Sequence, residues 1–321
     1  MRNFINWHDV AALPLRGYRL RGRLGLSEDQ AVKRRWADTA ISVLWTDLPA
    51  VRERCNALMT GDPQTEHYDY IANKFLKPLE PLTGLSLGCG NGDREFRWFQ
   101  SCQFARLDGV DLSEPQITSA RLRSEREGLA ERLMFQVSDV SRMVWPVNHY
   151  DVVFGEHSLH HFRQVDRLFA GIAQSLREGG YFIVNEYVGP ARFQWTDQQL
   201  AAVSGALALL PDSYRCRQSD GSLKKSAWRP SVLRMYLSDP SEAVESNRIR
   251  EALYRHFDVI ELRNYGGTLL HVLLSDIAAN FTSDDSETKS ILALLFQIED
   301  LLMSLGMESD FMLAICRKRS E

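Results

Sequence analysis

Residues Leu85 to Gly92 read LSLGCGNG, and this stretch decides the fold class. An apolar segment runs directly into Gly88, Gly90 and Gly92. Glycines at alternate positions allow the backbone to turn tightly and allow a ligand to lie close against it. A helix is expected next, from about Asp93 to Gln100, with its N-terminus aimed at the same place. The stretch therefore predicts the strand, turn and helix that open a nucleotide-binding α/β unit.

The next apolar run, Ala105 to Val110, ends at Asp111. An acid there, about 20 residues after the glycines, can hydrogen-bond a ribose diol. A dinucleotide enzyme is the first alternative, but its GxGxxG pattern needs a glycine where this chain has Asp93. An acid at that helix N-terminus would also repel a pyrophosphate. The GxGxG spacing instead favours S-adenosylmethionine (SAM), whose sulfonium is cationic.

Further motifs follow within about a hundred residues: GVDLSEPQI around Asp111, FQVSDV around Asp139, YDVVFGEHSLHHF over 150–162, and LREGGYFIVNEY over 176–187. Together with the glycine loop, they closely resemble the class I (Rossmann-like) SAM-dependent methyltransferases. The resemblance implies SAM as the cofactor. It also implies a cofactor site made of Gly88, Cys89, Gly90, Gly92, Asp111, Leu112, Asp139, Val140 and Glu156. One position departs from the family pattern: an acid that helps to hold the methionine amine is replaced by Ser86.

Strands that alternate with helical patterns predict a doubly wound parallel sheet of the α/β class. The resemblance implies seven strands, mostly parallel, with an antiparallel last strand. Four regions are expected: an N-terminal helical extension (1–80), the first part of the SAM-binding core (81–188), a helical lid or substrate cover (189–250), and the second part of the core (251–321). Ligands of such sheets lie beyond the carboxyl ends of the strands. The residues that follow strands one, two, four and five are therefore expected around one pocket.

Individual elements are also expected outside the motifs. Asp47 followed by Pro49 is typical of a helix start. The predicted helices cover Glu28 to Leu44, Asp47 or Pro49 to Met59, Glu66 to Phe75, and Ser286 to Leu305; the predicted strands cover Phe257 to Arg263 and Phe311 to Arg317. The segment from Tyr265 to Thr268 is rich in glycine and is expected to form a loop.

Four residues are candidates for catalysis: His157, His160, Glu186 and Tyr187. A histidine pKa near ~6.5 suits proton removal at neutral pH, so His157 or His160 is a candidate base. A purely structural role is equally open for both, and His161 is expected to pack under its loop. Glu186 and Tyr187 either contact the acceptor or sulfonium, or form a buried pair at the hinge of the lid.

The cofactor candidates also have simpler alternatives. Asp111 can cap the following helix, and Asp139 can be a turn acid rather than an adenine contact. Glu156 either lies near the methionine end of SAM, where it could take over from the missing acid at Ser86, or neighbours a helix N-cap. The N-terminal segment is a second candidate for that amine. No residue is predicted to bind a metal.

Composition excludes several other classes. The net charge of −4 gives no general attraction to nucleic acid. The five cysteines are odd in number and form no CxxC pair, which indicates neither a disulfide framework nor a zinc site. Neither an apolar run of about 20 residues nor an apolar signal core is found. A cytoplasmic protein without membrane or nucleic-acid partners is therefore expected, and the oligomeric state stays open. The first 35 residues carry a net charge of +5, from eight basic and three acidic residues. Three interpretations stay open for this segment: a patch that binds an anionic partner, a solvated face, or an N-terminal helix that closes over the SAM pocket.

The sequence thus predicts an enzyme that transfers the methyl group of SAM to a small-molecule acceptor by SN2 substitution. Two alternatives keep the fold. The first is an enzyme that cyclises SAM to azetidine-2-carboxylate and releases methylthioadenosine, for which the absence of an acid at Ser86 is suggestive. The second is a SAM-binding protein without catalytic activity.

Overall fold

The computed structural model describes residues 43–319. The basic cluster of the first 35 residues, and nearly all of the helix predicted over 28–44, lie outside this range. Within the described range, no helix is both long enough and apolar enough to span a lipid bilayer.

The centre of the molecule is a seven-stranded sheet with the strand order β3-β2-β1-β4-β5-β7-β6. Its strands are β1 (Leu82–Leu87), β2 (Phe104–Asp111), β3 (Leu133–Val137), β4 (Tyr150–Glu156), β5 (Leu176–Tyr187), β6 (Phe257–Gly266) and β7 (Phe311–Lys318). All neighbouring strands run parallel except β7, which is antiparallel to both β5 and β6. The predicted doubly wound sheet with an antiparallel last strand is therefore confirmed.

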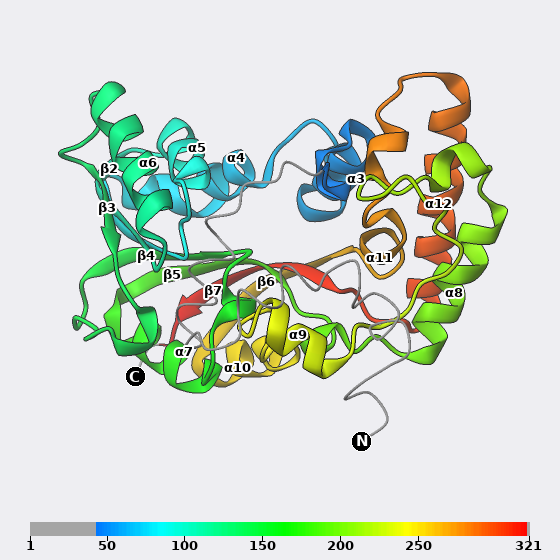
Figure 1. Ribbon diagram of the computed structural model, residues 1–321. Helices are drawn as coiled ribbons and strands as arrows, with labels where there is room; N and C mark the ends of the chain where they lie inside the picture. Colours follow the sequence, from blue (N-terminus) through cyan, green and yellow to red (C-terminus); the bar gives the residue numbers. More distant parts are fainter. Residues whose placement is uncertain (1–42, 320–321) are drawn as a thin grey trace.

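Both faces of the sheet are covered by helices (Figure 1). Helices α5 (Asp93–Ser101) and α6 (Glu114–Arg126) lie on one face, and α7 (Val165–Ser175) and α10 (Ile249–His256) lie on the other. Successive residues of a strand point to opposite faces. Phe154 accordingly belongs to the apolar cluster under α5, whereas its neighbour Val153 belongs to the cluster that contains Phe169 of α7. This two-sided burial explains why the strands of the core are almost continuously apolar.

The N-terminal segment packs on the same side as α5. It contains η1 (Trp45–Asp47), α3 (Pro49–Thr60), α4 (His67–Ile71), a wider π turn (Ala72–Leu76) and η3 (Lys77–Leu79). Gly61 adopts a φ of 91° and ends α3, as expected for a glycine at this position. The helix predicted over 66–75 is thus divided into an α turn and a π turn.

A further group of helices lies beside the sheet (Figure 1). It combines α8 (Asp197–Leu209) with α11 (Leu270–Leu274) and α12 (Ser286–Ser304), and α11 contacts both of the other two. Helix α9 (Val232–Ser238) lies below the sheet. Short 3-10 turns link the elements at Val140–Arg142, Leu159–His161, Ala191–Phe193, Asp212–Arg215, Ser246–Arg248 and Ala278–Phe281. The predicted division of the chain at residues 80, 188 and 250 remains a prediction.

Strand β6 is longer than expected. The sequence predicts that it ends at Arg263 and that a loop begins at Tyr265, but pairing with β7 continues to Gly266, opposite Phe311. Gly266 and Gly267 both have positive φ angles, 93° and 81°, and a Cβ on Gly267 would lie 2.3 Å from the Phe311 ring. The expectation of a loop from Tyr265 is therefore wrong for its first two residues, because β6 continues past an irregularity at Tyr265 and pairs again with β7 at Gly266.

Candidate functional site

The three glycines of the loop after β1 have different surroundings. All have positive φ angles: 67° for Gly88, 55° for Gly90 and 86° for Gly92. A Cβ on Gly88 would lie 2.5 Å from the Ser158 side chain, and one on Gly92 would lie 2.7 Å from the Phe135 ring. A Cβ on Gly90 would have no described atom within 4 Å. The outer two glycines therefore allow close packing, and the middle one borders the space in which a ligand would fit.

Asp111, at the end of β2, is bonded to this loop. Its Oδ2 accepts a hydrogen bond from the Gly90 amide at 3.0 Å, and its Oδ1 accepts one from the Ser113 amide at 2.8 Å. Each carboxylate oxygen keeps a further lone pair that a ribose hydroxyl can use. Leu112 lies beside it and is half-buried. The helix that follows (α6, Glu114–Arg126) has Ser113 as its N-cap, so the predicted capping role of Asp111 is wrong: its carboxylate bonds two amides that precede the helix. The ribose contact remains a prediction, and the free lone pairs are compatible with it.

Asp139 is the N-cap of the turn that follows β3. Its Oδ1 accepts hydrogen bonds from the amide and the hydroxyl of Ser141, at 2.9 and 2.6 Å. Its Oδ2 lies 3.2 Å from Nε of Arg142. These contacts fit the turn acid that was the simpler alternative, and the adenine contact remains a prediction. Val140 and Cys89 are buried, and burial raises the pKa of the Cys89 thiol well above its usual range, so both present neutral walls.

Glu156, at the end of β4, joins the N-terminal segment to the sheet. Its Oε1 accepts a hydrogen bond from the Trp98 indole at 2.6 Å, and its Oε2 lies 2.9 Å from Nε2 of His67. Asn185 of β5 continues the network: its amide nitrogen lies 3.5 Å from Nε2 of His67, and its amide oxygen accepts a hydrogen bond from the Tyr265 hydroxyl at 2.7 Å. Burial raises the pKa of Glu156, but the bond to His67 and its charge outweigh burial, and the net pKa is lowered. Both oxygens of this carboxylate are therefore already engaged by protein groups.

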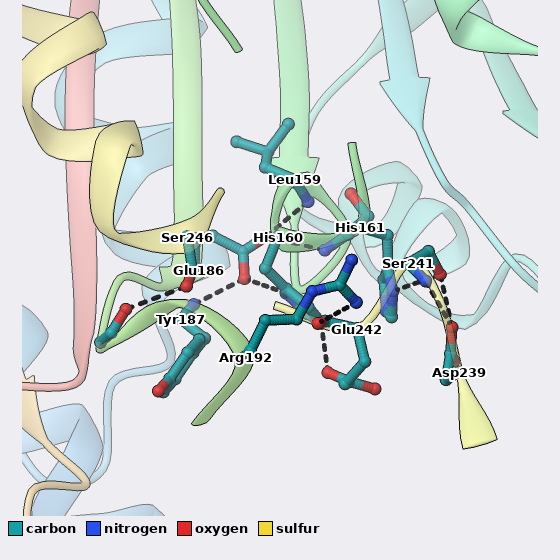
Figure 2. A network of polar contacts seen from close by, with 12 residues as sticks. Leu159, His160, His161, Glu186, Tyr187, Arg192, Asp239, Ser241, Glu242 and Ser246 are labelled. Carbon is teal, nitrogen blue, oxygen red and sulfur yellow. Dashed lines mark hydrogen bonds and ion pairs between the residues drawn. The ribbon is translucent and has the colours of Figure 1, made fainter. Parts of the chain in front are cut away.

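Glu186, in β5, organises the loop after β4 (Figure 2). Its Oε2 accepts hydrogen bonds from the amides of Ser158 and Leu159, at 2.8 and 2.6 Å. Its Oε1 accepts one from the Tyr187 amide at 2.6 Å and lies 2.5 Å from Nδ1 of His160. The carboxylate is fully buried. These four contacts match the buried polar role that was one of the two predictions for Glu186.

His160 lies between two carboxylates. Its Nδ1 bonds Glu186, and its Nε2 is 3.4 Å from Glu242 of the inserted segment (Figure 2). Burial lowers the pKa of His160, but the charge and hydrogen bond of Glu186 outweigh burial and raise the pKa to about 9. At neutral pH the ring therefore carries a proton on each nitrogen and has no lone pair for a substrate proton. This bonding argues against the prediction of His160 as a base.

The same protonation bears on metal binding. The ligand atoms of His160, His161 and Glu242 lie within 4.8 Å of one another, a spacing that can hold a metal ion. A metal ion at this place would have to displace the proton from the His160 nitrogen that it binds. Nδ1 of His161 lies 3.1 Å from the Ser241 hydroxyl, in keeping with the structural role expected for this residue.

His157 differs from the other two histidines of the loop. Its backbone φ is 49°, and its ring lies 6.1 Å from that of Phe311. Burial lowers its pKa well below the usual value, and the positive charge of Arg94 lowers it further. The imidazole is therefore neutral at pH 7, and one of its ring nitrogens carries no proton. Of the two candidate bases, His157 alone keeps the protonation state that a base needs.

Aromatic rings from distant parts of the chain gather beyond the end of β5. The cluster contains Trp45 of η1, Tyr187 of β5, Phe193 and Trp195 of the insertion, His271 of α11 and Phe311 of β7. Phe193 and Trp195 stack with centroids 5.2 Å apart. Burial lowers the pKa of His271 to about 4, so this ring is neutral as well. The Tyr187 hydroxyl donates a hydrogen bond to the Pro190 carbonyl at 3.1 Å, which ties β5 to the start of the insertion.

Sequence reasoning missed two charged residues of α5. The Ser86 hydroxyl lies 2.5 Å from Oε1 of Glu95, a side chain that is 1% exposed. A carboxylate thus stands beside the position from which the family acid is missing, so the absence at Ser86 no longer favours SAM cyclisation. Arg94 precedes it and is half-buried. A signal was available for Glu95: it is spaced i, i+3 from the buried Trp98, and so occupies the stripe of the helix that faces the sheet.

Comparison with known proteins agrees with this fold. Residues 85–184 match the family model described as "Methyltransferase domain". A demethylmenaquinone methyltransferase of Bacteroides fragilis is 26% identical over 122 residues, which cover 38% of this chain and 50% of the relative. A 27-O-demethylrifamycin SV methyltransferase of Amycolatopsis mediterranei is 26% identical over 195 residues, covering 59% of this chain and 68% of the relative.

A solved structure shares the fold. Phosphoethanolamine N-methyltransferase 2 of Haemonchus contortus, in complex with SAM, superposes with a TM-score of 0.50 at 18% identity, covering 92% of this chain and 61% of that protein. The strand order, the glycine loop and the family match identify a class I SAM-dependent methyltransferase domain in this chain. The resemblance stated from the sequence is confirmed. The match to the Bacteroides relative spans only half of that protein's length.

Proposed function

We propose that this protein binds SAM at the glycine loop and catalyses transfer of its methyl group to a small-molecule acceptor held between β5 and the inserted segment. The observation that carries the proposal is the loop itself. Gly90 borders open space, while its amide is held by Asp111 at the end of the next strand. A bound SAM would supply an electrophilic methyl group on a sulfonium.

The donor residues of the loop fit this cofactor. Asp111 retains lone pairs for the ribose hydroxyls, and the protonated thiol of Cys89 adds no competing charge. Val140 and Leu112 offer apolar surface for an adenine ring. Asp139 keeps the predicted adenine contact in this proposal, beside its role as the cap of the turn after β3. The role of Glu156 is indirect, because its two oxygens hold Trp98 of α5 and His67 against the end of β4.

The acceptor side is supported by the aromatic cluster. Rings of Tyr187, Phe193, Trp195 and Phe311 meet where the insertion leaves β5, and a dry, rigid wall of this kind excludes water from a substitution reaction and aligns the two reacting groups. Cation–π attraction from such rings is worth about 0.5–2 kcal/mol for a sulfonium. An acceptor with an apolar body fits these walls better than a charged polymer does.

His157 is the candidate base in this proposal, needed where the acceptor must lose a proton. Its neutral imidazole can accept one, whereas His160 is held as an imidazolium. Glu186 and His160 are assigned to positioning, because together they fix the loop on which His157 stands. Tyr187 contributes its ring to the acceptor wall, since its hydroxyl is bonded to Pro190.

The test is to incubate the purified protein with SAM and resolve the products by mass spectrometry. The proposal expects SAM to remain intact alone and to yield S-adenosylhomocysteine when small-molecule extract is added. Methylthioadenosine and a four-carbon amino acid formed without an acceptor would establish cyclisation and refute methyl transfer. SAM binding without any product, across fractionated extracts, would favour a non-catalytic SAM-binding protein.

A further inference from the structure

Glu95 is a buried acid without an adequate partner. It lies in the first turn of α5, directly after the glycine loop, and is 1% exposed. Its Oε1 accepts the hydrogen bond of the Ser86 hydroxyl, but its Oε2 is buried and has no hydrogen-bond partner among the described residues. A buried carboxylate in this state is costly, so its retention calls for a specific explanation, such as a functional role or a bound group that completes its hydrogen bonds.

The neighbouring Arg94 is a positively charged residue that also lacks a partner among the described residues. Within residues 43–319 its guanidinium forms no hydrogen bond or ion pair. Its positive charge acts on groups around the carboxyl ends of the strands: it lowers the pKa of His157, and it opposes the effect of burial on the pKa of Glu156 and of Tyr265. Arg94 is the second residue of α5, a helix that begins directly after the glycine loop, so it stands at the same edge of the sheet as that loop. A cation and an acid, adjacent in sequence and not paired with each other, are presented at one place.

This arrangement complements a zwitterion. An α-amino acid group carries an ammonium and a carboxylate on one carbon, and these charges match Glu95 and Arg94 in sign. Other acids are less suited to the ammonium: both oxygens of Glu156 are engaged by Trp98 and His67, and Asp111 bonds backbone amides. Burial raises the pKa of Glu95 to about 7, and an ammonium ligand would stabilise its ionised form.

We propose that Glu95 and Arg94 recognise the amino acid end of SAM, with Glu95, oriented by the Ser86 hydroxyl, accepting hydrogen bonds from the ammonium and Arg94 donating to the carboxylate. This inference rests on the proposed SAM-binding function. In this assignment Glu95, on α5, supplies the negative charge that the family usually has at the position of Ser86, on β1. Charge-assisted hydrogen bonds of this kind are short and directional, so they would fix the methionine arm and, through it, the direction of the methyl group.

Two probes isolate this contact. S-adenosylhomocysteine and 5′-methylthioadenosine share the nucleoside and a neutral thioether, but only the first has the amino acid arm. Their affinities are measured by calorimetry at pH 8 for the full chain and for the variants Glu95→Gln and Arg94→Met. Each variant is expected to weaken S-adenosylhomocysteine binding by about 10- to 100-fold, the loss typical of a hydrogen bond to a charged group. Methylthioadenosine affinity should stay within about twofold.

Exposed residues of α6 provide matched controls. Glu125→Gln and Arg126→Met change the same charges on the surface and should leave both affinities unchanged. A milder variant, Ser86→Ala, retains the carboxylate and removes only its orienting hydroxyl, so a loss smaller than that of Glu95→Gln is expected. Methylthioadenosine binding also reports that each variant is folded, and Arg94→Met tests the inference independently should Glu95→Gln fail to fold.

The outcomes separate this inference from the proposed function. Wild-type affinity for S-adenosylhomocysteine in both Glu95→Gln and Arg94→Met would overturn the inference and leave SAM binding intact. An equal loss for both probes would also overturn it, because the effect would then lie in the pocket as a whole. A wild-type protein that binds neither probe would refute the proposed function and the inference together.

Discussion

His160 is predicted to stabilise the folded protein only while it is charged. Its pKa is raised from 6.5 to about 9, because Glu186 and Glu242 outweigh the effect of burial. A raised histidine pKa contributes stability that is complete below the unfolded value of 6.5 and is lost as the pH rises through 9. At about 1.4 kcal/mol for each pH unit between these values, the contribution is about 3 kcal/mol. His160→Gln removes this pH-dependent part.

The assay is urea unfolding of the wild type and of His160→Gln at pH 6.0 and pH 9.5. The measured quantity is the free energy of unfolding of the wild type minus that of the variant. This difference should be about 3 kcal/mol larger at pH 6.0 than at pH 9.5. Comparing the two proteins cancels the titrating groups that do not interact with His160. His149→Gln, at an exposed position, is the control and should show no such difference. A wild-type advantage that is equal at both pH values would refute the assignment of His160 as an imidazolium.

Three further predictions follow from the site. Asp111→Ala should weaken SAM binding by about 10- to 100-fold, because a ribose partner and the acceptor for the Gly90 amide are both lost; unchanged affinity by calorimetry would contradict the ribose assignment. Gly92→Ala should lower the free energy of unfolding by about 1–3 kcal/mol, since its Cβ would meet Phe135 at 2.7 Å. Gly90→Ala should destabilise the protein less and should weaken SAM binding, because its Cβ would enter open space beside the loop. Equal unfolding midpoints for the two variants would contradict this prediction. Burial raises the pKa of Glu95 from 4.5 to about 7, so the folded wild type loses stability as the pH rises through this range and the carboxyl ionises. The free energy of unfolding of Glu95→Gln minus that of the wild type, measured by urea unfolding, should therefore be about 3 kcal/mol larger at pH 8 than at pH 4.5. A pH-independent difference would show that the pKa of Glu95 is not raised.

Much of the fold was predictable from local patterns. The alternation of apolar strands and amphipathic helices, with the glycine loop between them, predicted the doubly wound sheet, and helices α3, α5 and α12 begin at or within a residue or two of the expected positions. These patterns are short-range, because the periods of strand and helix are set by the backbone itself. The end of β6 was missed since it depends on hydrogen bonds from β7, a strand nearly fifty residues further along the chain.

The site residues divide in the same way. The positions of Gly88, Gly90 and Asp111 follow from spacing alone, because the carboxyl ends of neighbouring parallel strands lie at one edge of the sheet. Which histidine is charged does not follow, although His157 and His160 stand three residues apart in one loop. Burial and Arg94 keep the first neutral, while Glu186 and Glu242 keep the second protonated.

The sequence by itself therefore determined the class of fold, the cofactor that the loop suits and the edge of the sheet where chemistry is expected. Only the tertiary structure decided the protonation state of each group there. It also placed the Glu95 carboxylate beside Ser86 and engaged Glu156 with His67. The physical reason is that backbone periodicity is a local property, whereas the charge of a buried side chain depends on its solvation and on neighbours that arrive from anywhere along the chain.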